Sequence, residues 1–182
     1  AFHWWIGDTY ASNFGPLRDR RLNPFRTFEA KGVRWANGSD FDVTPFPARY
    51  GIWAAVARET LLGSVPGDPF GRDEAVDVRT ALKAATIWAA HQFFLEDKIG
   101  SIEVGKYADL AVWDRDPYSV PTAELKEMRC LLTVFNGREV YAAPDQHFQV
   151  DVRELVVLVL GGNFLDVDAH AVDARGDDGD HA

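Results

Sequence analysis

The spacing of apolar residues changes at Gly100, and this change constrains the fold more than any other feature of the sequence. Before it, apolar residues recur every three or four positions, and helix start and stop signals alternate with loops. After it, short apolar runs alternate residue by residue, which is typical of strands. A chain built in this order combines helices with a sheet. The helix, Gly turn, strand and loop predicted between residues 23 and 47 are typical of an α/β unit, so the sequence predicts the α/β class.

Helices dominate the predicted elements before Gly100. Asn23-Pro24 marks a helix start and Gly32 its stop, since Pro suits the first helical position and Gly the residue after the last. The prolines at 45 and 47 end the extended run that precedes them. The predicted elements are helices over about 23–31, 48–62 and 73–93 and a strand over 33–40.

A small β module is predicted after Gly100. Four short runs have the alternation of strands, at 101–104, 109–113, 131–135 and 139–141. Asn136-Gly137 separates the last two, and this pair predicts a tight hairpin because both central residues of a type I′ turn need positive φ.

Charge separates residues 144–182 from the rest of the chain. Residues 1–143 hold 19 acidic and 17 basic side chains, whereas residues 144–182 hold 9 acidic and 2 basic ones. From Asp166 onward the sequence is polar and acidic, and it cannot bury enough apolar surface to offset the entropy of ordering. We therefore expect an acidic, disordered tail over 144–182.

The composition argues against several classes of protein. With a net charge of −9 over 182 residues, the chain has no basic excess to neutralise nucleic-acid phosphates. Its longest apolar run, Leu155 to Leu160, is far shorter than the roughly 20 residues that cross a bilayer. The lone Cys130 excludes a disulfide scaffold. We expect a cytoplasmic protein without nucleic-acid or membrane partners.

Asp40 is the best candidate for a catalytic side chain. It ends the predicted strand after Gly38 and Ser39, and catalytic groups gather at the carboxyl ends of strands in parallel α/β folds. Ala36 and Gly38 share its strand face and leave room beneath the carboxylate. Asp40 could act as a general base, a metal ligand or both. An aspartate that caps the following loop has the same local pattern, so this alternative stays open.

Histidines give little support from local spacing. His3 stands beside Trp4 and Trp5, where it either lines a pocket, as a candidate substrate-binding residue, or packs among the rings. The sequence contains no His-x-His, His-Glu-x-x-His or Cys-x-x-Cys. A metal site therefore cannot be assembled from neighbouring residues alone.

Four segments together resemble the metal-dependent amidohydrolases. The longest, Ile99 to Asp114, resembles the signature where the chain of these enzymes leaves a barrel and returns to a β-sandwich. Thr86 to Ala90 resembles the family's Thr-x-Asn-x-Ala segment, with Trp88 where Asn is usual. Gly32 to Asp40 resembles the eighth barrel strand. Val43 to Val56 is similar to amidohydrolase family 3, a subgroup that includes N-substituted formamide deformylase-like enzymes.

The resemblance implies a (β/α)₈ TIM barrel with one or two divalent metal ions, usually zinc, and a β-sandwich built from both ends of the chain. It implies hydrolysis of amides or related non-peptide C–N bonds. The aspartate of the eighth strand takes the proton of the attacking water and passes it to the leaving nitrogen. By its match to Gly-Ser-Asp, that residue is Asp40, which would also be a metal ligand, and the substrate would be a small amide-like molecule.

The resemblance also divides the chain. Residues 1–98 correspond to the last βα units of the barrel and residues 99–143 to strands of the sandwich, while residues 144–182 match nothing in the family. The family's other metal ligands have no counterparts here, and a whole barrel needs roughly 250 residues. We therefore expect a C-terminal fragment that is inactive alone and whose partner is the missing N-terminal part of the barrel. A non-catalytic interaction module that keeps this fold is the alternative.

Overall fold

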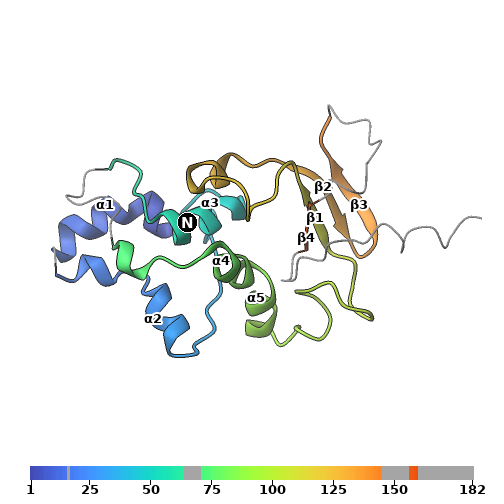
Figure 1. Cartoon of the computed structure of the whole chain (residues 1–182), viewed down its shortest axis with the longest axis horizontal. Helices are drawn as coiled ribbons and strands as arrows, with labels where there is room; N and C mark the ends of the chain where they lie inside the picture. The colour runs from blue at the N-terminus through green and yellow to red at the C-terminus, as the bar shows by residue number, and fades with distance from the viewer. Residues whose placement is uncertain (16, 64–70, 145–155, 160–182) are drawn as a thin grey trace, which may run out of the picture.

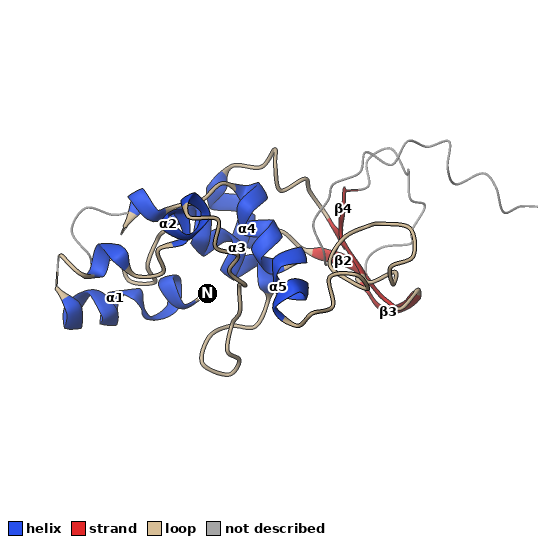
Figure 2. Ribbon diagram, turned by 90° about the horizontal axis from the view of Figure 1, so that it is seen from below, coloured by secondary structure: helices blue, strands red, loops and turns tan. Residues whose placement is uncertain are grey.

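Helices and strands occupy different ends of the molecule. The computed structural model describes residues 1–15, 17–63, 71–144 and 156–159. Helices α1 to α5 gather on one side and the strands on the other (Figure 1), and a view turned by 90° shows the same separation (Figure 2). The chain thus combines helices with a sheet, which is consistent with the predicted α/β class, although the helices and strands are segregated and do not alternate.

The helical elements are short. Their bounds are α1 Phe2–Phe14, η1 Asp19–Arg21, α2 Phe25–Ala30, α3 Ala48–Ala57, η2 Arg72–Glu74, α4 Val78–Ala85, α5 Ile87–Gln92 and η3 Thr122–Glu127, where η marks a 3₁₀ turn. In the described part of the chain, none is both long and apolar enough to cross a membrane. Helix α1 was not predicted, because apolar and aromatic residues surround its first turns without a helical repeat.

Two predicted helices are confirmed in place but differ in extent. Helix α2 begins two residues after Asn23 and ends before Gly32, whose φ of 68° needs glycine. Helix α3 was predicted to reach Leu62 but ends at Ala57, because Arg58 takes a left-handed conformation with φ 60°. The Arg58 side chain turns back into the protein, and its contacts are described below.

The predicted single helix over 73–93 is wrong, since the structure divides it. Residues 72–74 form η2, and Thr86, with φ −134° and ψ −101°, separates α4 from α5. The Thr86 hydroxyl donates to the Leu82 carbonyl at 2.6 Å, a bond back along the helix that competes with the helical ladder. Asp77 caps α4 by accepting from the Thr80 N–H at 2.7 Å.

The predicted strand over 33–40 is also wrong. The segment is irregular, and its Asn37 N–H donates to the Ala84 carbonyl at 2.9 Å. A strand needs a neighbour that pairs with it through backbone hydrogen bonds, and no strand within the described ranges does so. Trp35 holds the segment instead, because it is buried and its ring stacks on Phe25 at 3.9 Å.

Three of the four predicted strands are confirmed. The sheet has the order β3-β2-β1-β4 with antiparallel pairs, and its bounds are β1 Leu110–Trp113, β2 Cys130–Phe135, β3 Arg138–Ala142 and β4 Val156–Val159. Asn136 and Gly137 turn between β2 and β3 with φ of 49° and 74°, as the hairpin prediction requires.

The fourth predicted strand, 101–104, is wrong. Its residues form bends and turns that side chains hold together. The Ser101 hydroxyl donates to Glu103 Oε1 at 2.5 Å, and Lys106 Nζ donates to Ser101. These bonds lower the pKa of Glu103, with the Ser101 bond as the largest cause.

Strand β4 lies inside the range predicted as a tail. It pairs with β1, so these four residues form a strand and not a tail. The remainder of 145–182, including the acidic stretch from Asp166, lies outside the described residues, and the domain boundaries at 98/99 and 143/144 stay predictions.

Helix α3 is the centre of the core. On one side Ile52 and Ala55 join a buried cluster, and on the other Trp53, Ala54 and Ala57 join a second one. The first cluster is completed by Trp35, Val76, Ala81, Leu82 and Ala84, the second by Leu125 and Met128 of the segment around η3. Because α3 is buried on both sides, the residues at its N-terminal end have a rigid support.

Candidate functional site

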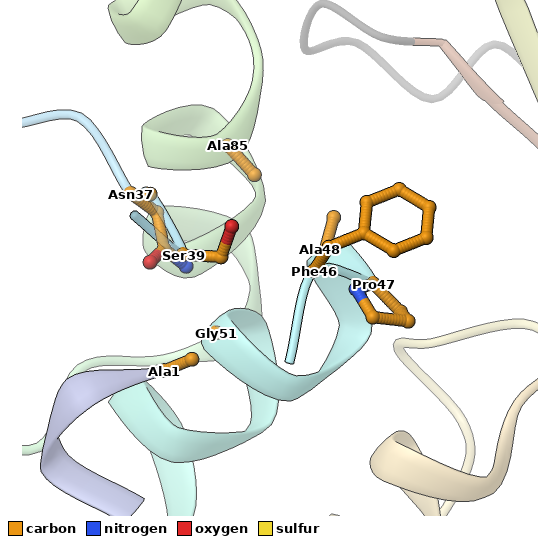
Figure 3. A pocket seen from close by; sticks show the side chains of 9 residues that line it. Ala1, Asn37, Ser39, Phe46, Pro47, Ala48, Gly51 and Ala85 are labelled. Atoms are coloured by element: carbon orange, nitrogen blue, oxygen red, sulfur yellow. The ribbon is translucent and has the colours of Figure 1, made fainter. Parts of the chain in front are cut away.

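A pocket lies where residues 36–40 pass the beginning of α3. It consists of two hollows of about 220 Å³ each, and both are lined by Ala1, Asn37, Gly38 and Gly51. We call the two together the Gly38 pocket. Figure 3 shows Asn37 and Ser39 on one side of the first hollow and Phe46, Pro47 and Ala48 on the other, with Gly51 between them.

The structure brings both predicted site residues to this pocket. Asp40 and His3 line the second hollow, together with polar Asn23 and Asn37 and the ring of Phe25. They come from segments 37 residues apart in the sequence, and no local pattern joins them. A carboxylate and an imidazole that share one small hollow are suited to proton transfer and to orienting a polar ligand.

Asp40 is presented by a tight turn. Its φ is 48°, and its carbonyl accepts from the Val43 N–H at 2.7 Å. Thr44 is buried, and its hydroxyl donates to the Ser39 carbonyl at 2.5 Å. These bonds occupy the backbone of the turn and leave the exposed Asp40 side chain outside them. Asp40 therefore does not end a strand, as predicted, but lies in a turn that hydrogen bonds hold in place.

His3 is packed inside the protein and also lines the second hollow. Its side chain is buried, and Nε2 lies 3.1 Å from the Arg58 carbonyl. Because a carbonyl only accepts, Nε2 must carry the hydrogen of that bond. His3 is thus buried and also belongs to the lining of the second hollow, while its role in substrate binding stays a prediction.

Arg58 stabilises the backbone of segments around the pocket, and the sequence did not predict this role. Its guanidinium is buried and donates to three carbonyls, those of Leu22 at 2.7 Å, Asn23 at 3.1 Å and Gly71 at 3.2 Å. Burial lowers the pKa of Arg58 to about 10, while the carboxylates of Glu74 and Asp73 act in the opposite direction. A lone arginine at the end of an apolar helix was the available signal.

Gly51 lets Asn37 approach α3 closely. A Cβ at position 51 would lie 2.6 Å from Asn37 Nδ2, which is closer than such atoms pack. The amide of Asn37 therefore lies directly over the helix backbone at the floor of the pocket (Figure 3). Gly51 is required here for space, since its φ is not among the positive values.

Metal-binding groups are few around the pocket. Within residues 1–15, 17–63 and 71–144, no three His, Cys, Asp or Glu side chains come together as a group that could hold a metal ion. Asp40 is the one carboxylate in the lining of the Gly38 pocket among these residues. The residues present do not suffice for a metal site, so further ligands would have to come from elsewhere.

The remaining histidine of the described part lies away from this pocket. His91 Nδ1 is 2.6 Å from Glu96 Oε1 at the end of α5, and this bond is the largest cause of the lowered pKa of Glu96. His147, His170 and His181 lie outside the described residues. His91 is thus a hydrogen-bond partner of Glu96 at the surface.

Comparison with known proteins decides the family. The sequence profile described as Amidohydrolase family matches residues 2–141, more than three quarters of the chain. The chain belongs to the amidohydrolase family. The match confirms the resemblance to amidohydrolase family 3, and it spans the turn that presents Asp40 as well as strands β1 to β3.

Named relatives agree with this membership. The N-substituted formamide deformylase of Arthrobacter pascens is 40% identical over 138 residues, which cover 75% of this chain and 24% of that protein. YtcJ of Bacillus subtilis (strain 168) is 32% identical over 126 residues, covering 68% and 24%. The 5-methylthioadenosine/S-adenosylhomocysteine deaminase of Thermodesulfovibrio yellowstonii is 33% identical over 141 residues, covering 69% and 31%. The chain spans only 24% to 31% of the length of these relatives.

Proposed function

We propose that this amidohydrolase-family chain supplies part of the active site of a hydrolase that acts on non-peptide C–N bonds, such as amides. The observation that carries the proposal is the meeting of Asp40 and His3 in the lining of one hollow. The names of two relatives, a deformylase and a deaminase, support it, because both denote reactions at a C–N bond.

Asp40 is the proton-transfer group of the proposed reaction. Its carboxylate accepts a proton from the water that attacks the substrate carbon, and it returns this proton to the nitrogen as the C–N bond breaks. The clamped turn at Ser39 and Thr44 holds the carboxylate in one place during both transfers. His3 and Asn37 border the same space and orient the polar part of the substrate.

A divalent metal, zinc by family resemblance, belongs to the proposal for the intact enzyme. When bound, such an ion lowers the pKa of water and polarises the substrate carbonyl. Asp40 would be one ligand. Because the described residues offer no complete ligand group, the steps above rely only on residues of this chain.

We further propose that residues 1–98 are the last units of a (β/α)₈ barrel and that residues 99–143 are strands of a β-sandwich. Segment 33–40 supports the barrel through its resemblance to the eighth barrel strand, although the segment forms no strand in the described part of the chain. Strands on either side would come from the missing N-terminal part of the barrel, the partner that the proposal requires. The isolated chain is therefore expected to be inactive.

A chimera tests the proposal. The 138 residues matched in the Arthrobacter pascens deformylase are replaced by those of this chain, and hydrolysis of an N-substituted formamide is measured. We expect an active chimera. Asp40→Asn in it is expected to lower kcat by about 10²-fold or more, because positioned proton transfer contributes that much.

Asp42→Asn is the matched control, since Asp42 is an exposed carboxylate two residues away. It is expected to keep the activity of the parent chimera. If Asp40→Asn and Asp42→Asn reacted at equal rates in an active chimera, Asp40 would not be the proton-transfer group.

A non-catalytic interaction module is the second candidate function. The sheet favours it, because Phe135, Val140 and Tyr141 are all exposed, and exposed apolar surface is typical of interaction sites. An inactive chimera that still folds and binds metal like its parent enzyme would favour this candidate.

A further inference from the structure

Two exposed aromatic rings stand beside the Gly38 pocket. Phe41 is 74% and Phe46 69% exposed, so neither belongs to the core. Their ring centroids lie 6.0 Å apart with planes at 72°, which is the favoured edge-to-face geometry. The two rings thus form one apolar surface.

This surface borders the first hollow, while Asp40 lines the second hollow, which shares Asn37, Gly38 and Gly51 with the first. Phe41 follows Asp40 directly in the sequence, and Phe46 lines the hollow that contains Asn37 and Ser39. Figure 3 shows the Phe46 ring across the hollow from the side chains of Asn37 and Ser39. One side of the pocket is therefore polar and the other apolar.

The loop that carries both rings is held in place. Thr44, between the two phenylalanines, is buried and bonded to the Ser39 carbonyl, and Pro45 and Pro47 flank Phe46. Proline fixes φ and reduces the conformations open to such a loop. The backbone that carries the two rings is therefore restrained, although the rings themselves are not packed in the core.

From this arrangement we infer that the Gly38 pocket takes an amide that carries an apolar, ring-sized group. The inference rests on the proposed function and adds the substrate class. The apolar group lies against Phe46 and Phe41, and the amide faces Asn37, Ser39 and Asp40. Ligand sites commonly combine apolar walls with a few polar groups that set orientation.

Binding of two amides to the full 182-residue chain tests the inference without turnover. Benzamide carries a ring and acetamide does not. Each is titrated into ¹⁵N-labelled protein, and the amide signals of Gly38, Ser39 and the Asn37 side chain are followed. We expect benzamide to bind more than about tenfold more tightly than acetamide, as burial of a ring predicts.

Variants locate the apolar wall. Phe46→Ala is expected to weaken benzamide binding by about three- to tenfold and to leave acetamide binding unchanged. Phe46→Leu keeps an apolar side chain, so its affinity for benzamide should be closer to that of the parent chain. Because Phe46 is exposed, neither substitution is expected to unfold the chain. If Phe46→Ala nevertheless unfolds it, the benzamide affinity of Phe46→Leu is compared with that of the parent chain instead. Phe135→Ala, an exposed phenylalanine of β2, is the matched control.

The inference is overturned if benzamide and acetamide bind with equal affinity, or if benzamide shifts only amide signals of residues outside the pocket. It is also overturned if Phe46→Ala and Phe135→Ala change the affinity for benzamide equally. These outcomes are separate from failure of the proposed function. Ring-dependent binding together with a fully active Asp40→Asn chimera would refute the proton-transfer role alone. An inactive Asp40→Asn chimera without ring-dependent binding would refute the substrate class alone.

Discussion

At the scale of single residues, Arg58 connects parts of the helical region that are far apart in the sequence. One guanidinium donates to carbonyls of residues 22, 23 and 71, and its own carbonyl meets His3. These bonds satisfy backbone acceptors that would otherwise lose their partners away from water. The floor of the Gly38 pocket thus depends on a residue that does not line it.

Arg58→Lys tests this role. Lysine keeps the charge but cannot span three carbonyls with a planar fork of donors. We expect the free energy of unfolding, measured by urea denaturation, to fall by about 2 to 3 kcal/mol. Arg129→Lys, at a side chain that is 68% exposed, should change it by less than about 0.5 kcal/mol. Equal losses in the two variants would contradict the role assigned to Arg58.

Residues also show what a sequence can and cannot reveal about a site. Asp40 could be selected because small residues and a loop surround it in the sequence. Its meeting with His3 could not be predicted from spacing, because it depends on how α1 packs against α3. Arg58 gave only a weak signal, its place at the end of an apolar helix, because its partners are backbone carbonyls that any residue type provides.

At the scale of elements, caps and breaks decide where helices lie. Helix α4 starts at a clear local signal, Asp77, whose carboxylate accepts from the Thr80 N–H. Its end at Thr86 has no such signal, because the apolar repeat continues through α5. The sequence thus predicted helix over the residues of α4 and α5 but neither the start at Val78 nor the division at Thr86.

Asp77→Ala removes the cap of α4. We expect the free energy of unfolding to fall by about 1 kcal/mol, because one backbone donor of the first turn loses its acceptor. Hydrogen exchange of the Thr80 amide should become faster. Asp97→Ala, at an exposed aspartate beyond the end of α5, is the control. A Thr80 amide equally protected in both variants would show that the carboxylate does not cap the helix.

At the scale of the whole molecule, the sheet joins residues that are far apart in the sequence. Strand β1 lies between β2 and β4, and β4 comes more than forty residues after β1. Neither the alternation within β1 nor the acidic composition after Pro144 indicates this pairing. Strand β4 gives β1 a second hydrogen-bonded neighbour, without which β1 would be an edge strand.

A chain that ends at Pro144 tests the pairing. Removal of β4 is expected to lower the hydrogen-exchange protection of the β1 amides while the hairpin of β2 and β3 keeps its protection. The protection of the β1 amides and of the hairpin amides in the full chain serves as the reference. Unchanged protection of β1 would contradict pairing with β4.

The sequence by itself determined the local features: the family signature from Ile99 to Asp114, the turn at Asn136-Gly137, the start of α2 and the candidate role of Asp40. These depend on backbone preferences and side chains within a few residues of each other. The tertiary structure alone decided the end of α3, the unpaired state of segment 33–40, the pairing of β4 and the pocket shared by Asp40 and His3. Each of these requires a partner from a distant part of the chain, and a contact with a distant partner leaves no periodic mark in the local sequence.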